Sequence, residues 1–214
     1  MIDRRQLLAL FSAALLAIVL TIASSDADAR DSGAFVKDLG DRAIEMLTSK
    51  ETSKDEQERR FRTLLREGFA IDKIGKFVLG KYRRKASKGE IEDFLLLFED
   101  YIVSLYSSAF RNFSGETFNI KRVVKTKRAR DTMVITQIVP TNNGAPTKMI
   151  FQVRTIDKNF KILDIRIEGV SMIITQRDEF TTYISKHGGT VAALIDALRK
   201  KTKDLKTRAK DDKK

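Results

Sequence analysis

The sequence predicts an α+β fold in which helices pack on one face of a curved, antiparallel, four-stranded sheet. Apolar residues recur at helical spacing through roughly the first half of the chain. Four alternating or β-branched segments then follow between residues 118 and 168, and helical spacing returns after Gly169. The connections between these four segments are short, so the strands are expected to be antiparallel neighbours, because parallel neighbours need long crossovers.

Residues 1–29 are predicted to be a signal peptide and not part of the fold. Arg4 and Arg5 form a positive start, residues 7–22 form an apolar stretch, and an A-x-A cleavage site ends at Ala29. The apolar stretch is shorter than the ~20 residues of a comfortable transmembrane helix, although an uncleaved membrane anchor is the alternative. The paired arginines leave twin-arginine export open beside general export. We therefore expect cleavage after Ala29 and an exported, soluble protein.

Much of the positive charge lies at the C-terminal end. The formal net charge is +12, and residues 199–214 hold nine Lys or Arg against three Asp. We expect residues 30–200 to form one domain and residues 201–214 to form a basic tail that is disordered or a fraying helix end. Basic proteins often bind nucleic acid, but for an exported protein the expected counter-charge is the anionic headgroups of a membrane, with a solvated tail as the alternative. The chain has no cysteine, so an exported fold must rest on its hydrophobic core.

Three helices are predicted before the longest one. They cover approximately residues 32–47, 54–68 and 72–80. Asp31 or Ser32 can cap the first helix. Ser53 and Glu56 form a capping box at the start of the second helix, which stops near Gly68.

The longest predicted helix spans roughly residues 88–110. A second capping box, made by Ser87 and Glu90, opens it. Its apolar stripe is wider than the seam of a coiled coil. We expect this helix to lie on the sheet, since no other predicted element offers a large enough surface.

The four predicted strands are residues 118–125, 132–139, 148–156 and 160–168. Asn143 and Gly144 mark the hairpin loop between the second and third strands. Alternation in the last strand places Leu163, Ile165 and Ile167 on one face, and Asp164, Arg166 and Glu168 on the other. A helix is expected over residues 171–186, and Thr190 caps a final helix.

Two blocks of sequence carry a resemblance to a known family. One is Phe77-Val78-Leu79-Gly80-Lys81-Tyr82-Arg83-Arg84-Lys85-Ala86-Ser87, and the other is Glu168-Gly169-Val170-Ser171 followed by Gln176-Arg177, Glu179-Phe180 and Gly188-Gly189. In this order they resemble the MlaC-like, or toluene-tolerance, family of periplasmic phospholipid carriers, over roughly residues 35–198. The resemblance implies an NTF2-like cone that holds its ligand between sheet and helices.

The same resemblance implies a cargo and partners. The protein would be a monomer that carries phospholipid through the periplasm. Its partners would be an inner-membrane ABC transporter with an MCE-type subunit and an outer-membrane lipoprotein–porin complex, in support of outer-membrane lipid asymmetry. A hopanoid or another lipid is the alternative cargo, and no nucleic acid or cofactor is expected.

Residues that could perform chemistry are few. His187 is the single histidine, lies at a predicted helix end, and lacks the orienting partners of a catalytic histidine. No cluster has metal-ligand spacing, and neither a G-x-S-x-G motif nor a phosphate-binding glycine loop is present. Glu168 and Arg177 are expected to pair across the corner after the last strand, in a structural role. We therefore predict a binding protein that holds no metal and is not an enzyme.

An apolar layer is the strongest candidate for a binding site. Its predicted members are Phe69, Phe77, Tyr82, Phe94, Phe98, Tyr101, Leu105, Ile135, Met149, Phe151, Val153, Ile165, Ile167, Met172 and Phe180. From the residues alone a filled core explains such a layer better than a pocket, whereas the resemblance implies an open cavity for acyl chains. Arg83, Arg84 and Arg177 are candidates for holding the phosphate of the headgroup.

Two other classes of function remain open. An exported NTF2-like enzyme acting on a small hydrophobic substrate would need an isolated acid inside the apolar layer. The strand pattern places no Asp or Glu clearly inward, which disfavours that class. A structural adaptor would have a filled core and would hold its partners with its basic surface.

Overall fold

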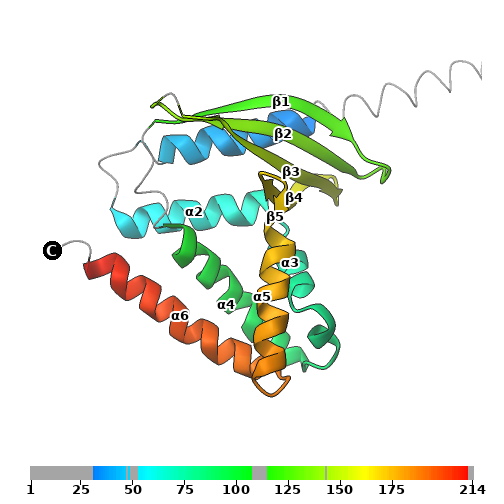
Figure 1. Cartoon of the computed structure of the whole chain (residues 1–214), viewed down its shortest axis with the longest axis vertical. Helices are drawn as coiled ribbons and strands as arrows, with labels where there is room; N and C mark the ends of the chain where they lie inside the picture. Colours follow the sequence, from blue (N-terminus) through cyan, green and yellow to red (C-terminus); the bar gives the residue numbers. More distant parts are fainter. Residues whose placement is uncertain (1–30, 47, 49–52, 108–114, 143, 212–214) are drawn as a thin grey trace, which may run out of the picture.

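The computed structural model describes residues 31–46, 48, 53–107, 115–142 and 144–211 (Figure 1). The predicted signal peptide lies outside these residues. No helix within them is both long enough and apolar enough to cross a membrane.

The described residues form helices around an antiparallel sheet. In chain order the elements are a helix over residues 31–46, α2 (Lys54–Gly68), α3 (Ile71–Val78), the 3-10 helix η1 (Gly80–Arg84), α4 (Lys88–Ser107), β1 (Thr117–Lys125), β2 (Asp131–Val139), β3 (Thr147–Ile156), β4 (Asn159–Ile167), β5 (Val170–Ser171), α5 (Met172–Lys186) and α6 (Val191–Asp211). The sheet runs in the order β1-β2-β3-β4-β5, and all neighbouring strands are antiparallel. The predicted α+β class is confirmed, with a short fifth strand added after Gly169.

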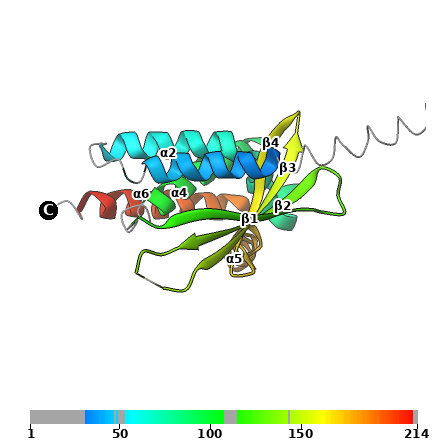
Figure 2. The same ribbon diagram turned by 90° about the horizontal axis from the view of Figure 1, so that it is seen from above.

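The sheet, helix 31–46 and α2 form one half of the molecule, which we call the sheet half. In Figure 1 the sheet lies at the top, with helix 31–46 directly beneath it and α2 below that helix. Figure 2 again places the two helices side by side. Val36 of helix 31–46 packs in one apolar cluster with Ile162 of β4. An ion pair of 2.5 Å joins Arg42 of the same helix to Glu67 of α2.

The remaining helices, α3, α4, α5 and α6, form the helical half. The rings of Phe94 and Phe98 in α4 stack with centroids 5.6 Å apart, and the ring of Phe180 in α5 meets them edge-on at 6.0 and 6.2 Å. Helix α4 packs chiefly against α6 and not on the sheet, so the prediction of its position is wrong. Other helices cover the apolar stripe of α4, because the apolar stripes of α3, α5 and α6 pack against it.

The serines of both predicted capping boxes cap their helices as expected. Ser53 Oγ accepts a hydrogen bond from the N–H of Glu56 at 3.3 Å, and Ser87 Oγ accepts one from the N–H of Glu90 at 3.2 Å. The Glu90 carboxylate in turn accepts the N–H of Ser87 at 2.8 Å, which completes the second box. Glu56 instead pairs with Arg60 at 2.7 Å. The first helix already includes residues 31 and 32, so its cap lies outside the described residues.

Strand β4 contains a bulge that the alternating pattern does not reveal. Ile162 pairs with Val153 and Asp164 pairs with Gln152, so Leu163 is the extra residue. Ile162 and Ile165 therefore both pack in the apolar cluster of the sheet half, although they are three positions apart.

Asp164 is buried, so the prediction that no acidic residue of the strands lies inward is wrong. Its exposed fraction is 3%, its Oδ1 accepts the N–H of Ile173 at 3.3 Å, and its Oδ2 lies 3.5 Å from Nε of Arg166. The first N–H groups of a helix need acceptors, and α5 begins directly over Asp164. The carboxylate is therefore turned inward by a helix start that the strand pattern alone cannot place.

The corner between β4 and α5 also differs from its prediction. Glu168 and Gly169 have positive φ angles of 47° and 87°, which makes the tight turn into β5. The Glu168 carboxylate accepts the backbone N–H of Lys148. The guanidinium of Arg177 lies over the ring of Phe77, 4.9 Å from its centroid. The predicted pair between Glu168 and Arg177 is not formed, because each side chain has a nearer partner.

Helix α6 continues through residues 201–211, where a disordered tail or a fraying helix end was expected. Thr202 is 5% exposed and Leu205 is half-buried, so both extend the apolar stripe that begins at Val191. This stripe gives the basic segment an inner face to pack, and the side chains of Lys203, Lys206 and Arg208 are exposed. Residues 212–214 lie outside the described part of the chain.

Candidate functional site

Two apolar cavities adjoin one another in the sheet half and at its boundary with the helical half. The first has a volume of about 480 Å³ and lies between helix 31–46, α2 and strands β1 to β4. The second has a volume of about 310 Å³ and lies between α2, α3, α4, β4 and α5. Five residues line both cavities, namely Phe61, Leu65, Phe69, Met149 and Ile165. The cavities are therefore neighbouring chambers that share an apolar wall.

The corner between α2 and α3 positions this shared wall. The N–H of Phe69 caps α2 by bonding the carbonyl of Leu65 at 2.9 Å, and the N–H of Ala70 bonds the carbonyl of Ile162 at 3.0 Å. The second bond attaches the corner to β4, where Phe69 and Ile162 form an isolated parallel bridge. The attachment holds the ring of Phe69 between the two cavities.

Polar groups are scarce on the cavity walls. Glu116 and Thr117 lie at one end of the first cavity, and Tyr106, Asp164 and Gln176 line the second. Burial, with a smaller effect from the charge of Glu179, raises the pKa of Tyr106, so its phenol stays neutral. Such walls favour apolar ligands and offer a few hydrogen bonds at their edges.

Seven of the predicted layer residues line a cavity. They are Phe69, Phe98, Met149, Phe151, Ile165, Ile167 and Met172. The strand residues among them lie on the inner face of the sheet, which the alternating pattern identifies even across the bulge. Ile167 is 36% exposed, which places it at the rim of the second cavity.

The other eight predicted residues do not line either cavity. They are Phe77, Tyr82, Phe94, Tyr101, Leu105, Ile135, Val153 and Phe180. Tyr82, Phe94 and Phe180 are buried in the filled core of the helical half, and Phe77 and Tyr101 pack against it. Leu105 is half-buried in α4, and Val153 is buried in the apolar cluster under the sheet. Ile135 pairs with Ile150 on the opposite face of the sheet from Phe151.

The sequence interpretation missed one wall completely. Leu39, Ala43 and Ile44 of helix 31–46 line the first cavity, as do Phe61 and Leu65 of α2. The sequence contained a signal for this wall, because these residues form the apolar stripes of the first two predicted helices. The interpretation lacked a reason to place those stripes over the sheet.

The three arginines proposed for a headgroup do not line either cavity. Arg83 and Arg84 are exposed on η1, and Arg177 lies over Phe77. His187 caps α5, where its Nδ1 lies 2.8 Å from the carbonyl oxygen of Tyr183 and its ring stacks on that tyrosine at 3.9 Å. No group of three or more His, Cys, Asp or Glu in the described ranges could hold a metal ion.

Comparison with protein families assigns the chain. The family description "MlaC protein" matches residues 37–200. The chain belongs to the MlaC family. This confirms the resemblance found in the sequence.

A solved structure shows the same fold as this MlaC-family chain. It is that of a phospholipid-binding protein from Ralstonia solanacearum, determined in complex with a phospholipid. The TM-score is 0.69 with 20% sequence identity, and the match covers 80% of this chain and 97% of the other. At this identity the likeness establishes the fold.

Proposed function

We propose that this MlaC-family protein binds a phospholipid and performs no chemistry on it. The observation that carries the proposal is the pair of adjoining apolar cavities with one shared wall. A diacyl lipid has two chains that diverge from one glycerol, so one chain can occupy each cavity while the glycerol lies near the rim. The phospholipid complex of the Ralstonia protein supports the proposal by analogy of fold.

The apolar walls can supply the affinity by themselves. Each methylene moved from water into contact with such a wall contributes about 0.8 kcal/mol to the free energy of binding. Two acyl chains therefore contribute on the order of 20 kcal/mol before ordering costs are subtracted. A headgroup can then stay in water, which explains why no arginine needs to point into either cavity. Selection among headgroups is accordingly expected to be weak.

We further propose that the protein is a periplasmic carrier. The predicted signal peptide and the family membership support export and lipid handling. In this proposal the loaded protein travels between an inner-membrane ABC transporter with an MCE-type subunit and an outer-membrane lipoprotein–porin complex. A hopanoid would fit the same apolar walls and is the alternative cargo.

The test is native mass spectrometry of the purified protein, with extraction of the material that it carries. We expect a diacyl phospholipid at one per chain. Ala43→Phe places a ring in the first cavity and should lower lipid occupancy several-fold, whereas Ala192→Phe adds the same ring on the exposed face of α6 and should leave occupancy unchanged. A ligand-free protein that also takes up no added lipid would overturn the proposal.

One observation favours a second candidate, an exported enzyme acting on a small apolar substrate. Asp164 lines the second cavity and is the inward acid that such an enzyme requires. Its carboxylate, however, already accepts the N–H of Ile173 and lies beside Arg166, which are structural uses. Asp164→Asn should therefore keep lipid occupancy while lowering the melting temperature; turnover of an apolar ester or ketone that this substitution abolishes would instead establish the enzyme.

A further inference from the structure

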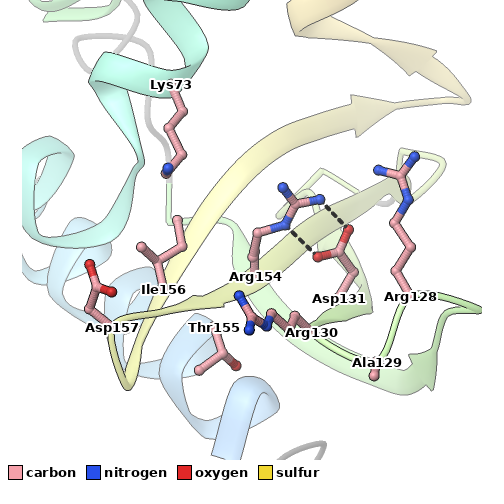
Figure 3. Close-up of a pocket in the computed structure, with 9 residues that line it drawn as sticks. All are labelled: Lys73, Arg128, Ala129, Arg130, Asp131, Arg154, Thr155, Ile156 and Asp157. Carbon is pink, nitrogen blue, oxygen red and sulfur yellow. Dashed lines mark hydrogen bonds and ion pairs between the residues drawn. The ribbon is translucent and has the colours of Figure 1, made fainter.

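Besides the two apolar cavities, the protein has a cleft with a polar and basic lining. Its volume is about 550 Å³, and we call it the basic cleft. Its lining residues are Lys73 of α3, Arg128, Ala129, Arg130 and Asp131 at the β1–β2 turn, and Arg154, Thr155, Ile156 and Asp157 at the end of β3 (Figure 3). It shares no lining residue with either cavity.

The basic cleft and the cavities open toward opposite ends of the sheet. The first cavity reaches Thr117 and Ile138, where β1 begins and β2 ends. The basic cleft lies where β1 ends and β2 begins, beside the turn from β3 to β4. A ligand in the basic cleft therefore does not need to be part of the ligand in the cavities.

One cation of the basic cleft is held in a fixed position. Nε and Nη2 of Arg154 donate to the two oxygens of Asp131 at 2.6 and 2.7 Å, and Nε2 of Gln152 donates to the same carboxylate at 3.1 Å. Asp131 is 2% exposed, and the bond from Arg154 lowers the pKa of this carboxyl, so the pair remains ionised. Asp131 uses only one edge of the guanidinium, and within the described residues no other acceptor bonds it. Its remaining N–H groups can therefore donate to a ligand.

The other three cations of the basic cleft are Lys73, Arg128 and Arg130. In the part of the chain that the structure describes, Lys73 and Arg130 make no side-chain hydrogen bond or ion pair with an acid. In Figure 3 Lys73 reaches from α3 toward Ile156, Arg130 lies beside the strand, and Arg128 stands on the side of Asp131 away from Ile156. The lining holds four cations, Lys73, Arg128, Arg130 and Arg154, against the two carboxylates of Asp131 and Asp157, which leaves an excess of two positive charges.

We propose that the basic cleft is a binding site for a phosphate group that carries two negative charges. A phosphate monoester carries about −1.5 to −2 at pH 7, which matches the excess charge of the lining. Its oxygens can accept from the fixed guanidinium of Arg154, from Arg130 and Lys73, and from the hydroxyl of Thr155. A single carboxylate would neutralise half of the excess and would bind more weakly. The phosphate can belong to a soluble monoester or to a lipid headgroup such as that of phosphatidic acid.

The proposal is tested with lipid-loaded, full-length mature protein at about 0.15 M salt. One arm measures binding of inorganic phosphate and glycerol 3-phosphate by calorimetry. The other measures co-sedimentation with phosphatidylcholine vesicles that contain phosphatidic acid, against pure phosphatidylcholine vesicles. The variant Lys73→Gln/Arg130→Gln removes two exposed cations of the basic cleft, and Lys81→Gln/Arg83→Gln removes two exposed cations of η1 as a control of equal charge.

We expect the cleft variant to weaken binding at least about tenfold and the control to leave it within about twofold. Binding in the first arm identifies a soluble monoester, and binding in the vesicle arm alone identifies a headgroup. Absence of binding in both arms, or equal weakening by the η1 control, would overturn the proposal. Unchanged lipid occupancy in the cleft variant shows that the cavities are intact.

Discussion

The helical half of this protein is filled, whereas the sheet half is hollow, although both are built from similarly apolar segments. In the helical half the rings of Phe94, Phe98 and Phe180 touch one another. In the sheet half Val36, Leu39 and Ala43 of helix 31–46 all line the first cavity. A twisted sheet curves away from a straight helix, so the two surfaces leave a gap between them.

The difference teaches that an apolar stripe does not distinguish a core from a binding site. Helices interdigitate their side chains along the line of contact and leave few voids. A helix over a curved sheet leaves space that only a ligand or larger side chains can fill. Four sets of substitutions test whether the two halves are packed differently.

The largest effect is expected from truncating one aromatic ring in each half. Phe94→Ala removes a ring that is 0% exposed and should lower the free energy of unfolding by about 3–5 kcal/mol. Phe61→Ala enlarges cavities that already exist. Compared with Phe94→Ala, it should therefore lower the free energy of unfolding less and the lipid occupancy more. Denaturant unfolding of lipid-free protein and native mass spectrometry measure the two effects. Equal losses of stability would show that the halves are packed alike.

Another loss of stability is expected at the ion cluster of Glu99, Arg62 and Arg66, which joins the two halves. Glu99 of α4 bonds Arg62 of α2 at 2.7 Å and Arg66 of α2 at 3.0 Å. Glu99→Gln should lower the free energy of unfolding by about 1–2 kcal/mol, a modest value because Arg66 is largely exposed. A loss as large as that of Phe94→Ala would mean that this cluster, and not aromatic packing, holds the halves together.

The same cluster predicts a pH dependence. Burial alone would raise the pKa of Glu99, but its hydrogen bonds to Arg66 and Arg62 lower it on balance. A carboxyl with a lowered pKa stabilises the fold above its unfolded value of about 4.3 and loses that contribution as the pH falls further. The wild type should therefore lose more stability than Glu99→Gln between about pH 5 and pH 3. Parallel curves for the two proteins in thermal unfolding would contradict this assignment.

A matched pair of glycines is expected to give effects that differ in sign. A Cβ at Gly75 of α3 would lie 2.5 Å from Leu95 Cδ2 and 3.3 Å from Phe98 Cδ1, within the filled core. A Cβ at Gly40 would lie 2.5 Å from the ring of Phe118, which can move into the first cavity. Gly75→Ala should cost about 1–3 kcal/mol, whereas Gly40→Ala should be neutral or stabilising by up to about 1 kcal/mol from helix propensity. Thermal unfolding compares them, and a cost at Gly40 equal to that at Gly75 would mean that Phe118 cannot move.

The smallest effect tests the turn at the end of β3. Asp157 and Lys158 have positive φ angles of 49° and 65°, which non-glycine residues adopt at a cost of about 1–2 kcal/mol each. Lys158→Gly should relieve this cost and raise the free energy of unfolding by about 1 kcal/mol. Lys158→Ala is the control, since it removes the charge without freeing the backbone, and it should not stabilise. Stabilisation of equal size by both variants would assign the effect to charge.

The sequence predicted local structure well and packing poorly. Capping boxes, strand alternation and the turn at Gly169 depend on neighbours in the chain, and the elements they predict are present. The bulge at Leu163 and the inward turn of Asp164 depend on β3 and on the start of α5, so they have no local signal. The helical continuation of α6 had a signal in Thr202 and Leu205, which the high charge of the segment concealed.

The candidate site shows the same division. Strand alternation correctly identified Met149, Phe151 and Ile165 as inward residues. Three aromatic residues of α4 and α5 were assigned to a cavity that they do not line, namely Phe94, Tyr101 and Phe180. A large aromatic side chain indicates that its position is buried, but it does not indicate which element or ligand covers it. The lining residues of helix 31–46 looked like an ordinary amphipathic face.

The sequence by itself determined the fold class, the order of the elements and the family, because these depend on periodicity, capping and motif order along the chain. The positions of the cavities and of the basic cleft became clear from the three-dimensional packing. A cavity forms where two surfaces of different curvature face each other, and a basic cleft forms where two turns and a helix start meet. Both are properties of elements brought together from distant parts of the chain, which no local pattern of residues contains.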